Sequence, residues 1–141
     1  MIREFQKADL DRVAEIWRNG NLEAHSFIAE EYWKDRFDMV KEMLGSAEIY
    51  VFEEKKEILG FIGLNGNYIE GIFVDAEERS KGIGRQLLDY AKGVKGSLSL
   101  NVYAKNERAM KFYLREGFVI RKKSVDSDTG EQEYKMTTIF P

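Results

Sequence analysis

The chain has 141 residues, of which 43% are hydrophobic and 13% aromatic, and its formal net charge is −3. This composition predicts one folded domain over residues 1–141, and the near balance of charge gives no indication of nucleic-acid binding. With no cysteine and one histidine, we expect neither disulfides nor a bound metal. No apolar run is long enough to span a membrane, and the first residues lack an apolar signal segment, which together favour a cytoplasmic location.

The hydrophobic pattern predicts seven strands and four helices. The strands are expected at 2–5, 48–53, 58–64, 68–74, 98–103, 118–125 and 131–138, and the helices at 9–19, 30–44, 81–92 and 107–116. Asp9 is the expected cap of the first helix, and Gly20 and Asn21 its expected end. The resulting order, β-α-α-β-β-β-α-β-α-β-β, predicts an α/β fold with a mixed sheet and helices on both faces.

A glycine-containing segment, Arg79 to Gly84, lies between a predicted strand and a predicted helix. The first turn of a helix has unpaired N–H groups, and glycine lets an anion approach the backbone closely, so the segment indicates a phosphate or pyrophosphate site. It matches no Walker loop, and Leu87 stands where a dinucleotide fingerprint requires its third glycine. Taken alone, it is equally compatible with a helix start that binds nothing.

A second pattern follows between Asn101 and Phe118. Asn106 is a suitable helix N-cap, and Ala109 and Tyr113 fall three and seven residues later, on one helical face. The small side chain of Ala109 leaves that face open to a ligand, and Gly117 is suited to ending the helix.

The two segments together resemble the paired motifs of the GNAT (Gcn5-related N-acetyltransferase) superfamily. The residues that match are Arg79, Gly82 and Gly84 in the first motif, and Asn106, Ala109, Phe112, Tyr113, Gly117 and Phe118 in the second. The early Ile16-Trp17, the His25-x-Phe27 loop and the Glu31-Tyr32-Trp33 region resemble more particularly small bacterial acetyltransferases with protein-lysine activity.

This resemblance implies direct transfer of an acetyl group from acetyl-CoA to a primary amine of a protein or small molecule. It implies a central sheet splayed into a V, opened by a bulge near Glu70 and Gly71. The pantetheine arm would pair with the strand edge at Ile72, Phe73 and Val74 and contact Asn106, Ala109, Phe112 and Tyr113. The pyrophosphate would be held by Arg79, Ser80, Lys81, Gly82, Ile83, Gly84 and Arg85.

Tyr113 matches the family's general acid, although a core aromatic is the alternative interpretation. Glu70 is a candidate base because simple alternation places it on one strand face with Tyr68, Ile72 and Val74; a solvated strand residue is the alternative. His25 is the other candidate, since its ordinary pKa suits proton transfer near neutrality, but a structural role is also open.

The sequence indicates the acceptor site less specifically than the cofactor site. Four residues are expected to wall the acceptor pocket or else to belong to the core: His25, Phe27, Trp33 and Tyr68. The rival function is a non-catalytic CoA-binding or protein-interaction domain of the same fold, and the sequence is compatible with a monomer or a homodimer.

Overall fold

The computed structural model describes residues 1–79 and 81–138, so Ser80, one of the predicted pyrophosphate residues, lies outside the described residues. The strands are β1 (Ile2–Glu4), β2 (Glu48–Glu54), β3 (Glu57–Asn65), β4 (Tyr68–Val74), β5 (Ser99–Tyr103), β6 (Phe118–Val125) and β7 (Gln132–Thr138). The helices are α1 (Leu10–Ala24), α2 (Glu30–Leu44), α3 (Ile83–Lys95) and α4 (Glu107–Arg115), with short 3-10 turns η1 (Lys7–Asp9) and η2 (Ala76–Glu78). The predicted order of elements is confirmed. In these ranges no helix has the length and apolar character needed to cross a membrane.

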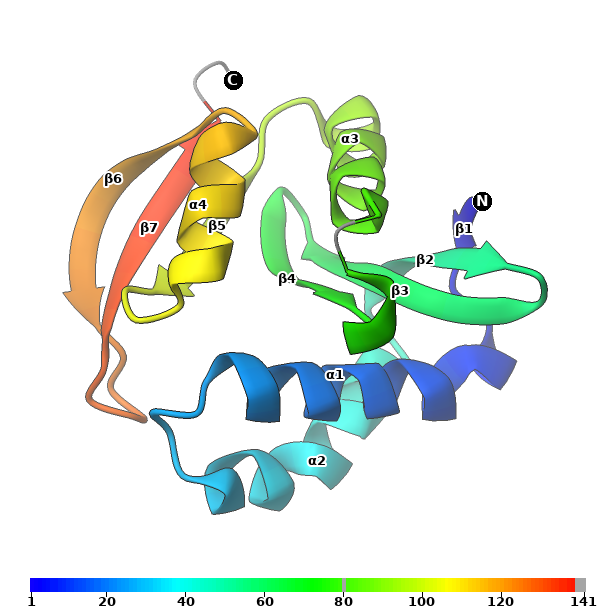
Figure 1. Cartoon of the computed structure of the whole chain (residues 1–141), viewed down its shortest axis with the longest axis horizontal. Coiled ribbons are helices and arrows are strands. Elements are labelled where there is room, and N and C mark those ends of the chain that lie inside the picture. The colour runs from blue at the N-terminus through cyan, green and yellow to red at the C-terminus, as the bar shows by residue number, and fades with distance from the viewer. Residues whose placement is uncertain (80, 139–141) are drawn as a thin grey trace.

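The strands form a single mixed sheet that splits in the middle. Its order is β1-β2-β3-β4-β5-β7-β6, and only the β4–β5 pair is parallel (Figure 1). These two strands pair only at Tyr68 with Ser99 and at Ile69 with Leu100. Beyond Ile69 the edge of β4 that faces β5 has no ladder partner among the described residues, which confirms the predicted splayed sheet.

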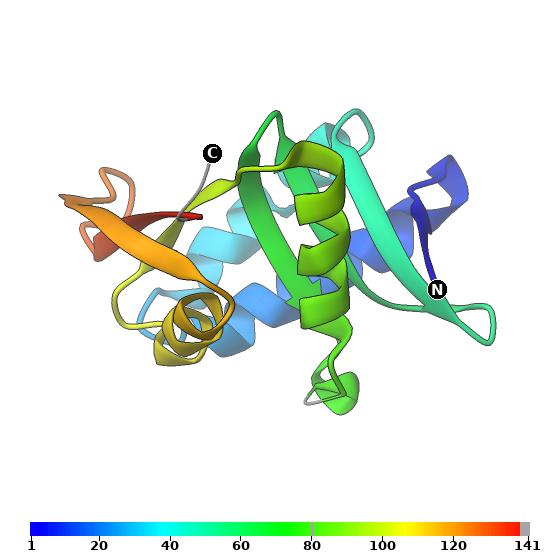
Figure 2. The same cartoon turned by 90° about the horizontal axis from the view of Figure 1, so that it is seen from above.

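Two hydrophobic clusters cover the two faces of the sheet. Successive residues of β2 alternate between them, as a strand requires: Ile49 and Val51 pack with α1 and α2, whereas Tyr50 and Phe52 pack with α3. In Figure 1, α1 and α2 lie below the sheet. Seen from above in Figure 2, α3 and α4 stand on either side of the line where β4 and β5 separate.

Two helices, α1 and α3, differ from their predicted bounds by more than one residue. α1 does not stop at Gly20 but continues to Ala24, because the ring of Phe73 lies against Gly20, where a Cβ would be only 2.9 Å from its Cδ1 atom. The side chain of Asn21 donates to the Trp17 carbonyl at 2.9 Å within the same helix. Tertiary packing therefore overrides the local helix-stop signal. α3 starts at Ile83 and runs to Lys95, so the expected range 81–92 is wrong by a few residues at each end.

A bulge interrupts β4 where the sheet begins to split. Gly63 of β3 pairs with Gly71, and the next residue, Leu64, pairs with Ile69, which leaves Glu70 as an extra residue. An extra residue in one strand bends it and increases its local twist. The bulge predicted near Glu70 and Gly71 is confirmed.

The bulge also changes which side chains share a face of β4. Ile72 and Val74 pack against the cluster under α3 and α4, whereas Phe73 packs against the cluster of α1 and α2. Glu70 lines a pocket together with Phe73, on the α1–α2 side. The prediction that Glu70 shares a face with Ile72 and Val74 is therefore wrong, because the inserted residue shifts the alternation by one.

Candidate functional site

The N-terminus of α3 offers bare backbone next to the free part of β4. Gly82 has a φ of 80°, a left-handed conformation that favours glycine, and a Cβ there would meet no heavy atom within 4 Å. A Cβ on Gly84 would lie 3.7 Å from Phe112 and 3.8 Å from Val74. The start of α3, the end of β4 and the middle of α4 therefore meet at Gly84. The first helical N–H groups, from Ile83 onward, have no acceptor within the helix and suit an anion.

Basic side chains surround this turn, and each is paired with a carboxylate. The pairs are Arg79 with Glu23, Lys81 with Glu78 at 3.1 Å, and Arg85 with Glu116 at 3.6 Å. Glu23 also lies 4.0 Å from Arg108, so this one carboxylate of α1 contacts both the segment before α3 and the start of α4. The hydrogen bond from Arg79 lowers the pKa of Glu23, which keeps it ionised at neutral pH.

Helix α4 supplies the other wall of the split. Asn106 is its N-cap, as predicted, and its side-chain oxygen accepts from the backbone N–H of Ala109 at 3.3 Å. Tyr113 is only 7% exposed and packs edge-on against Phe112 and Phe118, with ring centroids 5.2 and 5.4 Å away. Burial raises the pKa of the Tyr113 hydroxyl, so the phenol is fully protonated at neutral pH.

His25 follows the last residue of α1 and reaches across to α4. Its Nδ1 lies 3.0 Å from Oδ1 of Asn21, and its Nε2 lies 3.2 Å from Nδ2 of Asn106. The ring stacks on Trp33 at 5.3 Å and meets the edge of Tyr103 at 5.1 Å. Burial lowers the pKa of His25 to about 4, so the ring is neutral at pH 7.

Three of the predicted acceptor-pocket residues form one aromatic group between α1 and α2. Phe27 contacts both His25 and Tyr103 with ring centroids 5.7 Å away, and Trp33 packs at 5.9 Å from Trp17. Trp33 is buried, and its indole N–H has no hydrogen-bond partner in the part of the chain that the structure describes. The structure therefore brings His25, Phe27 and Trp33 together, with Trp33 in the core.

A small acidic group lies around Tyr68, the fourth predicted pocket residue. Burial raises the pKa of Tyr68, and the charges of Glu70 and Glu133 raise it further. Burial and the charge of Asp126 also raise the pKa of Glu133. Sequence reasoning missed Glu133, because its position depends on the register that places it opposite Tyr103 in the β5–β7 ladder.

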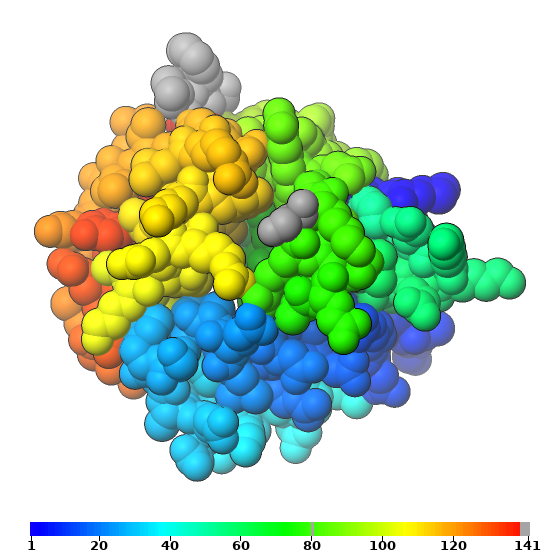
Figure 3. Space-filling view, in the orientation of Figure 1, coloured from blue at the N-terminus to red at the C-terminus, as the bar shows by residue number. Residues whose placement is uncertain are grey.

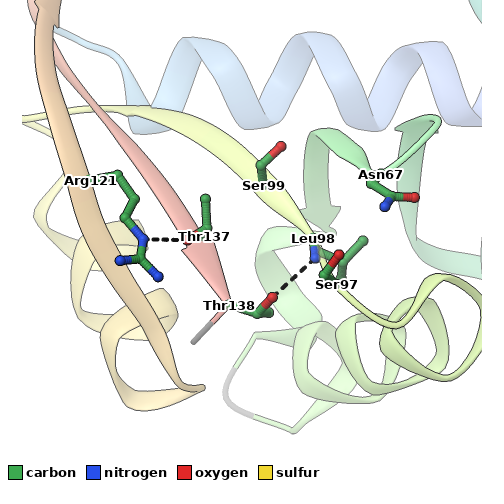
Figure 4. Close-up of a pocket in the computed structure, with 7 residues that line it drawn as sticks. All are labelled: Asn67, Ser97, Leu98, Ser99, Arg121, Thr137 and Thr138. Atoms are coloured by element: carbon green, nitrogen blue, oxygen red, sulfur yellow. Dashed lines mark hydrogen bonds between the residues drawn. The ribbon is translucent and has the colours of Figure 1, made fainter. Parts of the chain in front are cut away.

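Two hollows lie near the split, one on the α1–α2 face of the sheet and one at the closed end of the V. A hollow of about 550 Å³ lies on the α1–α2 face, lined by Glu70 and Phe73 of β4, Trp17 of α1 and Met43 of α2. The other, of about 320 Å³, lies at the closed end of the V, where Asn67 and Ser99 come together (Figure 4). The hydroxyl groups of Thr137 and Thr138 in this hollow accept hydrogen bonds from the protein itself, from Arg121 at 2.7 Å and from the backbone N–H of Leu98 at 3.2 Å.

The open end of the split is the part of the molecule where the predicted cofactor residues of β4, α3 and α4 converge. Figure 3 shows the yellow atoms of α4 bordering the green atoms of β4 and the start of α3, above the blue atoms of α1. In the described ranges, no group of three histidine or acidic side chains is arranged to hold a metal ion.

A mixed sheet that splits beside a glycine-started helix and an asparagine-capped helix defines an acetyltransferase of the GNAT type. The family model described as the acetyltransferase (GNAT) domain matches residues 45–120. The chain therefore belongs to the GNAT family of acetyl-CoA-dependent acetyltransferases, as the resemblance of its motifs predicted.

Individual relatives agree with this assignment. The chain is 35% identical to the peptidyl-lysine N-acetyltransferase YiaC of Escherichia coli K12 over 122 residues, which cover 85% of this chain and 84% of that protein. The solution structure of the apo form of YjaB from Escherichia coli matches with a TM-score of 0.88 and 27% identity, covering 100% of this chain and 98% of that one. The PaiA N-acetyltransferase of Thermoplasma acidophilum, solved with coenzyme A, has the same fold, with a TM-score of 0.83 at 20% identity and coverage of 98% and 97%.

Proposed function

We propose that this enzyme transfers acetyl groups directly to a primary amine, within a complex that holds acetyl-CoA and the amine together. The observation that carries the proposal is the unpaired edge of β4, flanked by the glycine-started α3 on one side and by Tyr113 of α4 on the other. An extended pantetheine arm can pair with such an edge as an added strand would.

This arrangement supports the cofactor contacts that the two motifs predict. The backbone of Ile72, Phe73 and Val74 pairs with the pantetheine arm, and Asn106, Ala109, Phe112 and Tyr113 line it from α4. The N-terminal turn of α3 holds the pyrophosphate through the backbone from Lys81 to Arg85, and Arg79 adds positive charge. An anion at this turn would weaken the pairs that the basic side chains make with Glu23, Glu78 and Glu116.

In the reaction, the amine nitrogen attacks the thioester carbonyl carbon, the carbon–sulfur bond breaks, and the sulfur leaves with the bonding electrons. A backbone N–H of Phe73 or Val74 donates to the carbonyl oxygen as it becomes negative. Tyr113 donates its hydroxyl proton toward the departing sulfur. Its raised pKa keeps that proton in place before attack, and the proton moves toward the sulfur only as negative charge develops there.

Glu70 is proposed to take the proton that the amine loses, through water. It lies on the α1–α2 side of β4, and neither an ion pair nor a hydrogen bond engages its carboxylate within the described ranges. The carboxylates of Glu70 and Glu133 beside Tyr68 give this side a negative field, which favours a positively charged acceptor. His25, Phe27 and Tyr68 would border the acceptor, with Trp33 supporting them from the core.

A lysine side chain of a protein is the acceptor we propose first. The 35% identical relative is named a peptidyl-lysine N-acetyltransferase. The acidic group around Tyr68 suits an ammonium group, and the adjoining hollow lined by Trp17, Phe73 and Met43 suits a hydrocarbon stem. A cytoplasmic location and a monomeric or dimeric state stay predictions.

The test is the release of CoA, measured with a reagent that reacts with free thiols. Because the protein has no cysteine, the thiol of the CoA product is the one that the reagent detects. We expect turnover with lysine peptides and none with the same peptides acetylated on lysine. Peptide N-termini, polyamines and aminoglycosides form the comparison panel. Acetyl-CoA at about 100 times its Kd should stabilise the protein by about 2.7 kcal/mol in thermal unfolding. Stabilisation without turnover of any amine supports the non-catalytic rival, and absence of stabilisation contradicts the cofactor site.

A further inference from the structure

The only histidine lies in a chain of hydrogen bonds that crosses from α1 to α4. Asn21 Nδ2 is 2.9 Å from the Trp17 carbonyl, and Asn21 Oδ1 is 3.0 Å from His25 Nδ1. His25 Nε2 is 3.2 Å from Asn106 Nδ2, and Asn106 Oδ1 is 3.3 Å from the backbone nitrogen of Ala109. The chain thus joins the backbone of one helix to the backbone of another.

The two backbone ends determine the direction of every bond in this chain. A carbonyl can only accept, so the amide nitrogen of Asn21 faces Trp17 and its oxygen faces His25. A backbone N–H can only donate, so the oxygen of Asn106 faces Ala109 and its amide nitrogen faces His25. His25 Nε2 must therefore accept from Asn106, and the hydrogen of the neutral ring is on Nδ1, where it is donated to Asn21.

The surroundings of the ring support this neutral form. His25 is mostly buried between the faces and edges of Phe27, Trp33 and Tyr103, and burial lowers its pKa to about 4. Both ring nitrogens are occupied, one as a donor and one as an acceptor. His25 therefore has no lone pair left with which to take a proton from an acceptor amine, and its candidacy as the base loses support.

We propose that His25 is a positioning residue for the cofactor site, which holds the Asn106 carboxamide in one orientation. A carboxamide has two N–H donors, and His25 accepts one of them, which directs the other to a carbonyl of the pantetheine arm. The inference rests on the proposed function, in which Asn106 contacts that arm. If the proposal holds, His25, in the segment after α1 on the acceptor side, determines the orientation of Asn106 on the cofactor side.

The first test reads the tautomer directly. In a long-range ¹H–¹⁵N correlation spectrum, the single histidine gives one pair of ring nitrogens that need no assignment by mutation. We expect the protonated nitrogen to be Nδ1 at neutral pH, without any ligand present. A ring protonated on Nε2, or one averaging between the two forms, overturns the proposal even if the protein is an active acetyltransferase.

The second test compares two variants that remove the ring equally. In His25→Gln the amide oxygen can reach the position of Nε2 and accept from Asn106, whereas His25→Asn is too short and can contact only the Asn21 side. We expect His25→Asn to raise the Kd for CoA, measured by calorimetry, by about threefold to tenfold, as for one lost hydrogen bond. His25→Gln should stay within about twofold of the wild type, because it keeps that bond.

Steady-state kinetics separate positioning from catalysis. We expect the KM for acetyl-CoA to rise with the Kd in His25→Asn and to stay near the wild-type value in His25→Gln, whereas any effect of the lost ring on kcat is shared by both variants. Equal losses of CoA affinity in the two variants, or a loss confined to kcat in both, contradict the proposal. If the wild type fails to bind CoA, the proposed cofactor site fails, but the tautomer result still stands by itself. Should a variant not fold, the tautomer measurement on the wild type remains decisive.

Discussion

Two glycines that pair directly across β3 and β4, Gly63 and Gly71, should differ strongly in how an added methyl group changes stability. A Cβ on Gly71 would lie 2.3 Å from Cε2 and 2.8 Å from Cζ of Phe73, far inside van der Waals contact. The Phe73 ring cannot simply turn away, because it stacks on Phe61 at 5.2 Å and lies against Gly20 on its other side. Gly71→Ala should therefore lower the free energy of unfolding by about 1–3 kcal/mol, the usual range for overpacking.

Gly63→Ala is the matched control, because a Cβ on Gly63 would meet only the Cβ of Glu70, at an ordinary 3.9 Å. Its free energy of unfolding, from urea titration, should stay within about 1 kcal/mol of the wild type, since alanine loses less backbone entropy than glycine on folding. Phe73→Leu removes the clashing ring atoms, so Gly71→Ala should destabilise that background less. Equal effects of the two alanines, or full additivity with Phe73→Leu, would refute the packing argument.

Three further outcomes follow from the site. Tyr113→Phe should lower kcat about 100-fold or more with little change in the Kd for CoA, whereas Tyr90→Phe, on exposed α3 surface, should change neither. Glu70→Gln should lower kcat/KM for the amine acceptor at neutral pH; an unchanged kcat/KM excludes Glu70 as the base. Because burial lowers the folded pKa of His25 to about 4 from 6.5, the unfolded chain takes up the proton first as pH falls. The wild type should therefore lose about 2 kcal/mol more stability than His25→Phe between about pH 8 and pH 5, and parallel losses in calorimetry or urea titration exclude this linkage.

The fold was predictable because its signals are local and consistent with one another. The alternation of residues in β2 and the apolar stripes of the helices indicate which face of each element is buried, without knowledge of what packs against it. The φ of Gly82 and the capping bond of Asn106 are also local, since each involves residues within one turn. For this reason Gly82 could be placed at the start of α3, and Asn106 at the cap of α4, from residue types and spacing alone.

The errors came from contacts between residues far apart in the chain. Gly20 favours the end of a helix by local preference, but in the structure it lies inside α1, and the ring of Phe73 from β4 packs against it. Glu70 changes faces because of how β3 and β4 pair, which alternation within one strand does not reveal. The partner of His25 is Asn106, which is 81 residues away. The one signal for this contact in the sequence was the i, i+4 spacing of Asn21, in α1, and His25, directly after it.

The bulge in β4 places the proposed base, Glu70, and the proposed acid, Tyr113, on different faces of the sheet. Without the bulge, Glu70 would share a face with Ile72 and Val74, on the side where α4 carries Tyr113. A carboxylate and a phenol on one face can hydrogen-bond to each other, which would hold the phenol proton away from the departing sulfur. With the bulge, Glu70 faces the α1–α2 side beside Tyr68, and Tyr113 stays buried on the α4 side. In the proposed reaction, the amine then loses its proton to Glu70 on one side of the split, while the sulfur gains one from Tyr113 on the other. If Glu70 and Tyr113 have the proposed roles, the one inserted residue in β4 places the base and the acid on opposite faces of the sheet.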